Sequence, residues 1–161
     1  HCGATFTITL PTAAKPLGEP VAPAPVAGRP DSMLTILLIE DHVDTADVMA
    51  QLIRGMGHEV TVAGRVDDAL AATQSTTYDL IVSDVGLPDG TGLDFIKAFR
   101  EHSGAPAVAL TGFGTDEDVR RCLAAGFTSH LTKPVNFLQL EQLIENAANV
   151  KAEKAQGPDS A

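Results

Sequence analysis

The chain of 161 residues has room for one domain of ordinary size with appendages, and 44% of its residues are hydrophobic, which suffices for a buried core. Aromatic residues make up only 4% and Trp is absent, so we expect a core of Val, Leu, Ile and Ala. The formal net charge of −10 argues against nucleic-acid binding, which requires a basic face. No apolar run approaches the ~18 residues of a membrane span and no signal peptide is visible, so we expect no membrane contact by this fragment. Cys2 and Cys122 are too few for a disulfide framework, which favours a reducing, cytoplasmic compartment.

Two N-terminal segments differ in composition from the rest of the chain. Residues 5–10 alternate polar and apolar side chains, as a half-buried strand does. Residues 3–11 resemble the closing strand of the ATP-binding domain of sensor histidine kinases, so we interpret residues 1–10 as a remnant of such a domain; a disordered leader is the alternative. Residues 11–32 hold six of the ten prolines and predict a semi-extended linker that reaches about 60 Å at ~3.1 Å per residue. Because the chain begins with His1 rather than Met, we expect it to be a piece of a longer protein.

From Met33 onward, short apolar runs alternate with segments of helical periodicity. Five strands that alternate with five helices through short loops predict right-handed crossovers and a parallel sheet. The last helix carries its apolar stripe from Phe137 to Ala147 and is expected to end near Val150, before a polar, disordered tail over 151–161. The predicted strands are 34–39, 60–63, 80–83, 107–110 and 128–131, and the first four predicted helices are 44–57, 66–74, 93–101 and 115–125.

Polar and charged side chains stand at the ends of four of the five predicted strands. The carboxyl ends of parallel strands meet at one edge of the sheet, which is where open α/β sheets place their ligand sites. Carboxylates that crowd there repel one another and require a cation, and oxygen ligands with access to water suit Mg²⁺. A lysine at this edge can pair with a carboxylate at rest and with an incoming phosphoryl group later. The residues concerned are Glu40 and Asp41, Asp84, Thr111, and Lys133 followed by Pro134.

Four motifs follow one another along the chain, namely Glu40-Asp41, Ser83-Asp84 with residues 87–92, Leu110-Thr111-Gly112 and Leu131-Thr132-Lys133-Pro134. Together they resemble the receiver domain of two-component response regulators, over the range from about Met33 to Val150. The resemblance implies a flavodoxin-like (βα)5 fold for residues 33–150, that is, a doubly wound parallel sheet with the strand order 2-1-3-4-5.

The resemblance implies phosphoryl chemistry at Asp84. Its carboxylate would attack the phosphorus of a phosphohistidine and form an acyl phosphate, a reaction that asks the protein mainly for positioning and charge neutralisation. The resemblance also implies a Mg²⁺ site, in which Asp41 binds the ion directly and Glu40 binds it through a water molecule. Asp84 and the backbone carbonyl of Gly86 would be the remaining protein ligands. Taken alone, a strand-end aspartate is more often a helix cap or loop residue, and the other motifs reverse that interpretation.

The resemblance also assigns roles around the phosphoryl group. Thr111 and Lys133 would each hold a phosphoryl oxygen, and the bond between Lys133 and Pro134 is expected to be cis, which aims the lysine inward. His130 falls at the position of the family's switch aromatic residue, where Tyr or Phe is more usual. We hypothesise that Thr111 moves toward phosphorylated Asp84 and that His130 fills the space behind it; an ordinary half-buried ring is the alternative for His130.

The remaining residues of chemical interest are expected to be structural. His42, His58 and His102 lack the spacing of metal ligands and are expected on the surface. Cys122 lies on the apolar stripe of its helix, which favours core packing over redox chemistry. Residues 89–92 are expected to form a turn and the start of a helix.

The leading hypothesis is a phosphoacceptor receiver at the C-terminus of a hybrid sensor histidine kinase, suggested by the strand-like start, the Pro-rich linker and the lack of an output domain after Val150. Such a receiver takes its phosphoryl group from a phosphohistidine domain in cis or in trans, catalyses its own phosphorylation and dephosphorylation, and can pass the group to a histidine phosphotransfer protein. The fragment would be cytoplasmic even within a membrane-anchored parent kinase. The alternatives are a receiver-only response regulator that acts by phosphorylation-dependent protein binding, a silent pseudo-receiver, and an aspartyl-phosphate hydrolase of the haloacid-dehalogenase type. The last requires an acid where this chain has Gly86.

Overall fold

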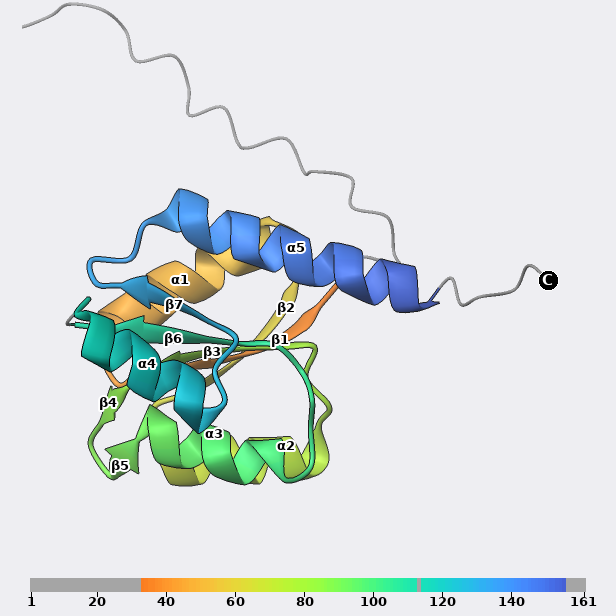
Figure 1. The fold of residues 1–161 in the computed structure, drawn as a ribbon. Coiled ribbons are helices and arrows are strands. Elements are labelled where there is room, and N and C mark those ends of the chain that lie inside the picture. The colour runs from red at the N-terminus through yellow and green to blue at the C-terminus, as the bar shows by residue number, and fades with distance from the viewer. Residues whose placement is uncertain (1–32, 113, 156–161) are drawn as a thin grey trace, which may run out of the picture.

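The structure, a computed structural model, describes residues 33–112 and 114–155. The expected kinase-domain remnant (1–10) and the Pro-rich linker (11–32) lie outside the described residues. Within these ranges, helices cover both faces of a central sheet (Figure 1). None of the helices in the described part of the chain is long and apolar enough to cross a membrane.

The central sheet has five parallel strands, namely β1 (Thr35–Ile39), β2 (Glu59–Ala63), β3 (Leu80–Asp84), β6 (Ala107–Thr111) and β7 (Ser129–Thr132). Their spatial order is β2-β1-β3-β6-β7. Counted within this sheet alone, the order is 2-1-3-4-5, so the predicted flavodoxin-like, doubly wound fold is confirmed. Each strand lies within two residues of its predicted range.

The helices form two layers, one on each face of the sheet, and are α1 (Val43–Gly55), α2 (Val66–Ser75), α3 (Gly92–Arg100), α4 (Asp116–Ala125) and α5 (Phe137–Ala155). α1 and α5 pack on one face, and α2, α3 and α4 pack on the other (Figure 1). Successive residues of β1 serve both layers: Ile36 and Leu38 point toward α1 and α5, whereas Leu37 and Ile39 point toward α2 and α3. This two-sided burial explains why the strand is apolar throughout.

A short antiparallel hairpin, β4 (Gly86–Leu87) with β5 (Gly90–Thr91), occupies the segment in which the sequence predicts only a turn. Asp89, at the tip, accepts hydrogen bonds from the backbone amides of Val66 at 2.9 Å and Asp67 at 3.1 Å, which caps the N-terminus of α2. The Val66 amide is the main cause of a lowered pKa at Asp89. The hairpin that follows β3 is therefore anchored to a helix on the same face of the sheet.

α5 is five residues longer than predicted, because it continues to Ala155 instead of ending near Val150. The expectation of a disordered tail is thus wrong for residues 151–155, which are helical, while residues 156–161 lie outside the described ranges. Lys151 Nζ donates to the carbonyl oxygen of Met33 at 2.9 Å and to Asp79 Oδ2 at 2.7 Å. Asp79 Oδ2 also accepts from the Thr35 amide at 2.8 Å. These contacts fasten the last turns of α5 to the start of β1.

His58 differs from the surface position that the sequence predicts. Its ring is half-buried, and Nδ1 accepts a hydrogen bond from the backbone amide of Leu34 at 3.3 Å. Burial lowers the pKa of His58 below its ordinary value of 6.5. The folded state therefore favours the neutral form of the His58 ring, because a protonated Nδ1 cannot accept that hydrogen bond.

We predict that His58 makes the protein less stable in mild acid. The unfolded chain takes up the His58 proton as the pH falls through about 6.5, but the folded chain does so only at lower pH, so stability contributed by this residue falls between those values. Urea unfolding at pH 7.5 and pH 5 measures the effect, and His58→Gln should reduce the difference between the two pH values. The matched control is His102→Gln at an exposed position. An unchanged pH dependence in His58→Gln would contradict the assignment.

Gly92, the first residue of α3, lies directly against the end of β3. A Cβ atom at this position would collide with the carbonyl oxygen of Asp84 and would lie 2.8 Å from the hydroxyl oxygen of Ser83. The Gly92 amide donates to the carbonyl oxygen of Val85 at 2.9 Å, which holds the two segments together. The absence of a side chain thus allows α3 to begin immediately behind Asp84.

We predict that Gly92→Ala lowers the free energy of unfolding by roughly 1–3 kcal/mol, the usual cost of overpacking a buried position. Urea denaturation of the purified variant measures this cost. Gly55→Ala is the control, because a Cβ atom there meets nothing within 4 Å and Ala is favoured over Gly in a helix. Equal stability of Gly92→Ala and the wild type would show that the contact relaxes freely.

Candidate functional site

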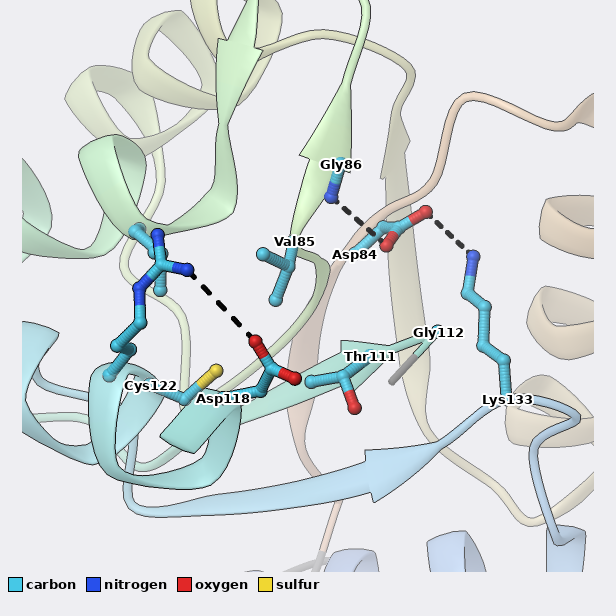
Figure 2. A pocket seen from close by; sticks show the side chains of 10 residues that line it. Asp84, Val85, Gly86, Thr111, Gly112, Asp118, Cys122 and Lys133 are labelled. Carbon is cyan, nitrogen blue, oxygen red and sulfur yellow. Dashed lines mark hydrogen bonds and ion pairs between the residues drawn. The ribbon is translucent and has the colours of Figure 1, made fainter. Parts of the chain in front are cut away.

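A lysine and two carboxylates form the centre of the site. Lys133 Nζ donates to Asp84 Oδ2 at 2.6 Å and to Glu40 Oε2 at 2.7 Å. The Glu40 side chain is 0% exposed and the Asp84 side chain 12%, so the ammonium group neutralises charge that water hardly reaches. Figure 2 shows the end of the Lys133 side chain directed at Asp84.

Each of the three side chains is placed by the end of a different parallel strand. Asp84 is the last residue of β3, Glu40 directly follows β1, and Lys133 directly follows β7. The Lys133 amide donates to the carbonyl oxygen of Thr111 at 2.7 Å, which fixes the segment after β7 beside the end of β6. The peptide bond between Lys133 and Pro134 is cis.

The environment keeps Lys133 protonated. Burial disfavours the charged ammonium, but the hydrogen bonds and negative charges of Asp84 and Glu40 outweigh this effect and raise the pKa of Lys133 above its ordinary value. A permanent positive charge is therefore available beside both carboxylates at neutral pH.

Asp41 lies at the outer side of the site with a partner that the sequence analysis did not assign. Its Oδ1 lies 2.9 Å from His42 Nδ1, and Glu40 Oε1 lies 3.3 Å from the same nitrogen. The hydrogen bond with Asp41 and the charges of Asp41 and Glu40 raise the pKa of His42. His42 is exposed, as predicted, but its ring contacts two of the four predicted metal ligands, Glu40 and Asp41.

The oxygen donors present suit a hard cation. One ligand atom each from Glu40, Asp41 and His42 lies within 4.8 Å of the others, the only such group found in the described ranges. Asp84 is joined to this group through Lys133. The Asp41 carboxylate is 30% exposed, which matches the preference of Mg²⁺ for one or two carboxylates together with water. Gly86 is exposed, and its amide donates to Asp84 Oδ1 at 3.2 Å.

A cavity of about 330 Å³ opens beside Asp84 (Figure 2). Thr111, which is buried at the end of β6, lines this cavity together with Asp84 and Lys133. His130 lies half-buried on β7, paired in register with Ala109, and is not among the cavity-lining residues. The structure thus brings Thr111 to the same cavity as the central carboxylate and places His130 on the neighbouring strand.

One wall of the cavity is a face of α4 that sequence reasoning missed. It consists of Asp118, Arg121 and Cys122, whose i, i+3 and i+4 spacing places them on one side of the helix. Cys122 is 2% exposed, and burial followed by the charge of Asp118 raises the pKa of its thiol. The thiol therefore stays protonated and packs as an apolar group, as predicted.

Comparisons with curated proteins find similar sequences in proteins of very different length. The chain is 35% identical over 117 residues to a 14.6 kDa protein of Leptolyngbya boryana, covering 71% of this chain and 89% of that protein. It is 30% identical to the transcriptional regulatory protein ZraR of Salmonella typhimurium, over 71% of this chain but only 26% of ZraR. It is 27% identical to probable histidine kinase 1 of Oryza sativa subsp. indica, over 68% of this chain and 15% of that protein. The chain therefore matches most of one small protein and minor parts of two larger ones.

A solved structure and a family model match the same part of the chain as these curated relatives. The chemotaxis response regulator CheY4 of Vibrio cholerae superposes with a TM-score of 0.68 at 30% identity, over 71% of this chain and 98% of that one. The family model described as response regulator receiver domain matches residues 36–145. This range contains all of the five strands except Thr35 of β1, and it contains the cavity and each predicted site residue. On this match, the chain belongs to the response regulator receiver domain family.

Proposed function

We propose that this receiver domain is a phosphoacceptor in a two-component phosphorelay and that Asp84 carries the phosphoryl group. The observation that supports this most is the pair of hydrogen bonds from Lys133 Nζ to Asp84 at 2.6 Å and Glu40 at 2.7 Å. They hold a nucleophilic carboxylate, an acidic neighbour and a fixed cation together, and two of these residues, Asp84 and Lys133, line the cavity. Phosphoryl transfer asks a protein for this combination of positioning and charge neutralisation.

In the proposed reaction, an oxygen of the Asp84 carboxylate attacks the phosphorus of a phosphohistidine. The new bond joins that oxygen to phosphorus, the phosphorus–nitrogen bond breaks, and the electron pair stays on the imidazole nitrogen of the donor, which takes up a proton. Lys133 then balances the negative charge of the phosphoryl group. Thr111, on the same cavity, offers a hydroxyl to one of its oxygens.

A magnesium ion fits the residues at the outer side of the site. Asp41 and Glu40 would hold it, with an oxygen of Asp84 and the carbonyl oxygen of Gly86 as the remaining protein ligands. When bound, the ion would neutralise charge that the carboxylates and the phosphoryl group bring together. The group of donor atoms at Glu40 and Asp41 supports this proposal.

The conformational response is part of the same proposal. Thr111 would move toward phosphorylated Asp84, and His130 on the adjacent strand would fill the space that it leaves, which shifts the face made of α4, β7 and α5. The half-buried position of His130 on β7, in register with Ala109 of β6, supports this role.

We further propose that the receiver belongs to a hybrid sensor histidine kinase in the cytoplasm. The kinase-like segment 3–11, the Pro-rich segment 11–32 and the match within a plant protein named as a probable histidine kinase support this context. The free thiol of buried Cys122 accords with a reducing compartment. A phosphohistidine domain, in cis or in trans, would be the donor, and a histidine phosphotransfer protein the next acceptor.

A receiver-only response regulator is the second candidate. The match over 89% of the 14.6 kDa protein of Leptolyngbya boryana favours it, because that protein is scarcely longer than the matched domain. The gene sequence upstream of His1 distinguishes the two: a kinase domain there supports the hybrid form, and a start codon within a few residues supports the receiver-only form.

We predict that incubation with Mg²⁺ and acetyl phosphate adds one phosphoryl group to the protein. Intact-mass spectrometry measures the gain, which should vanish in Asp84→Asn and when the metal is chelated. Asp68→Asn, at an exposed position of α2, is the matched control and should be labelled like the wild type. A phosphoryl group that persists in Asp84→Asn would contradict the site, and a wild type that is never labelled would contradict the function.

We predict that Lys133→Met destabilises the protein and makes its stability depend more strongly on Mg²⁺. The free energy of unfolding should fall by roughly 1–3 kcal/mol, less than for a fully buried pair, because the Lys133 side chain is 27% exposed. Added Mg²⁺ should restore more stability to the variant than it adds to the wild type, since a cation then offsets the unpaired carboxylates.

Urea unfolding with and without MgCl2 measures both effects. Lys97→Met, at an exposed position of α3, is the control for loss of a lysine. An equal Mg²⁺ effect in Lys133→Met, Lys97→Met and the wild type would contradict a shared cation site.

A further inference from the structure

The α4 wall of the cavity carries a second positive charge. Of the described residues that line the cavity, Lys133 and Arg121 are the two cations, and they come from different elements. Figure 2 shows Asp118 and Cys122 of the same helix face across the cavity from Asp84 and Lys133. The cavity therefore has a cation at the acceptor and another on the opposite wall.

The positive charge of Lys133 is already paired with the carboxylates of Glu40 and Asp84 before any phosphoryl donor binds. Its ammonium group is hydrogen-bonded to both Glu40 and Asp84, and Asp41 adds a third carboxylate at the same edge of the sheet. A phosphoryl donor such as acetyl phosphate brings two further negative charges toward this acidic region. Electrostatic attraction of such a donor requires positive charge that is not committed to the resting carboxylates.

Arg121 meets that requirement because its own ion pair is weak. Its one ion pair found within the described residues joins Arg121 to Asp118 at 4.0 Å, with side chains 63% and 31% exposed. Such a long, exposed pair contributes little to stability and breaks readily. The Asp118 carboxylate is also engaged by the Thr115 hydroxyl, so it retains a partner when Arg121 turns away.

We propose that Arg121 is a positioning residue that draws anionic phosphoryl donors into the cavity beside Asp84. The idea rests on the proposed phosphoacceptor function and adds a residue that the metal and phosphoryl ligands do not include. In the reaction with acetyl phosphate, the phosphorus–oxygen bond to the acetyl group breaks, acetate leaves with the electron pair, and the bond to Asp84 forms. Arg121 acts before this step, on the affinity for the donor, and not on the transfer itself.

The neighbouring Arg120 provides a matched control. It lies on the same helix and carries the same charge, but it does not line the cavity, and its Nε donates to the carbonyl oxygen of Asp116 at 3.2 Å. A general loss of positive charge from α4 would affect both positions equally, whereas a role in the cavity would affect only Arg121.

The test measures initial rates of phosphorylation against acetyl phosphate concentration at fixed Mg²⁺, for the wild type, Arg121→Gln, Arg121→Lys and Arg120→Gln. Arg121→Gln should raise KM about fivefold, which corresponds to one contact between unit charges near 4 Å in water, and leave kcat unchanged. Arg121→Lys and Arg120→Gln should stay close to the wild type. The difference in KM should shrink as NaCl is raised, because salt screens charge.

The outcomes separate this inference from the proposed function. Equal KM values for Arg121→Gln and Arg120→Gln, in proteins that are labelled at Asp84, would overturn the inference and leave the function intact. A fall in kcat without a change in KM would also overturn it, because Arg121 would then act on the transfer. A wild type that is never labelled would overturn both. Should Arg121→Gln fail to fold, Asp118→Asn tests the same idea, since removal of the counter-ion should lower KM.

Discussion

The hydrogen-bonded pairing of one ammonium group with two carboxylates is the interaction on which the site depends. Lys133 bonds to Glu40 and Asp84, which stand 93 and 49 residues away along the chain. Without the lysine, a fully buried glutamate and a nearly buried aspartate would face each other with uncompensated charge, which is costly in a protein interior. The same pairing that makes this edge stable holds the Asp84 carboxylate beside a cavity that a partner can enter.

The sheet topology makes this convergence possible. Because β1 lies beside β3, and β6 lies between β3 and β7, the residues that follow these strands share one edge although they are remote in sequence. A shift of β1 by one residue would exchange the side chains that pack against its two helix layers, so the fit of these side chains to each layer helps to fix the register. The core thus positions the charged groups, and those groups contribute little to the choice of fold.

The sequence was most informative where physical constraints are local. The alternation of strand-like and helical segments predicted the five strands, and the motifs at the ends of four of them located the carboxylates, Thr111 and Lys133. It was least informative about contacts between residues that are far apart along the chain. Asp89, for example, caps α2 by accepting hydrogen bonds from Val66 and Asp67, which precede it by 23 and 22 positions. Likewise, nothing in the local pattern indicated that His58 would contact Leu34, or that Asp118 and Arg121 would line the cavity. Lys151 looked like part of a polar tail because its partners, Asp79 and Met33, lie on other elements.

The contact between α5 and the start of β1 has a mechanical consequence. Lys151 donates a hydrogen bond to the carbonyl oxygen of Met33 at 2.9 Å, and both Lys151 and the Thr35 amide donate to Asp79. The start of β1 is therefore bound to the C-terminal part of α5. Met33 and Lys151 lie outside residues 36–145, the range that the family model matches. A force applied to the polypeptide at Met33 is therefore transmitted to α5 as well as to β1, and a displacement of α5 is transmitted in turn to Met33.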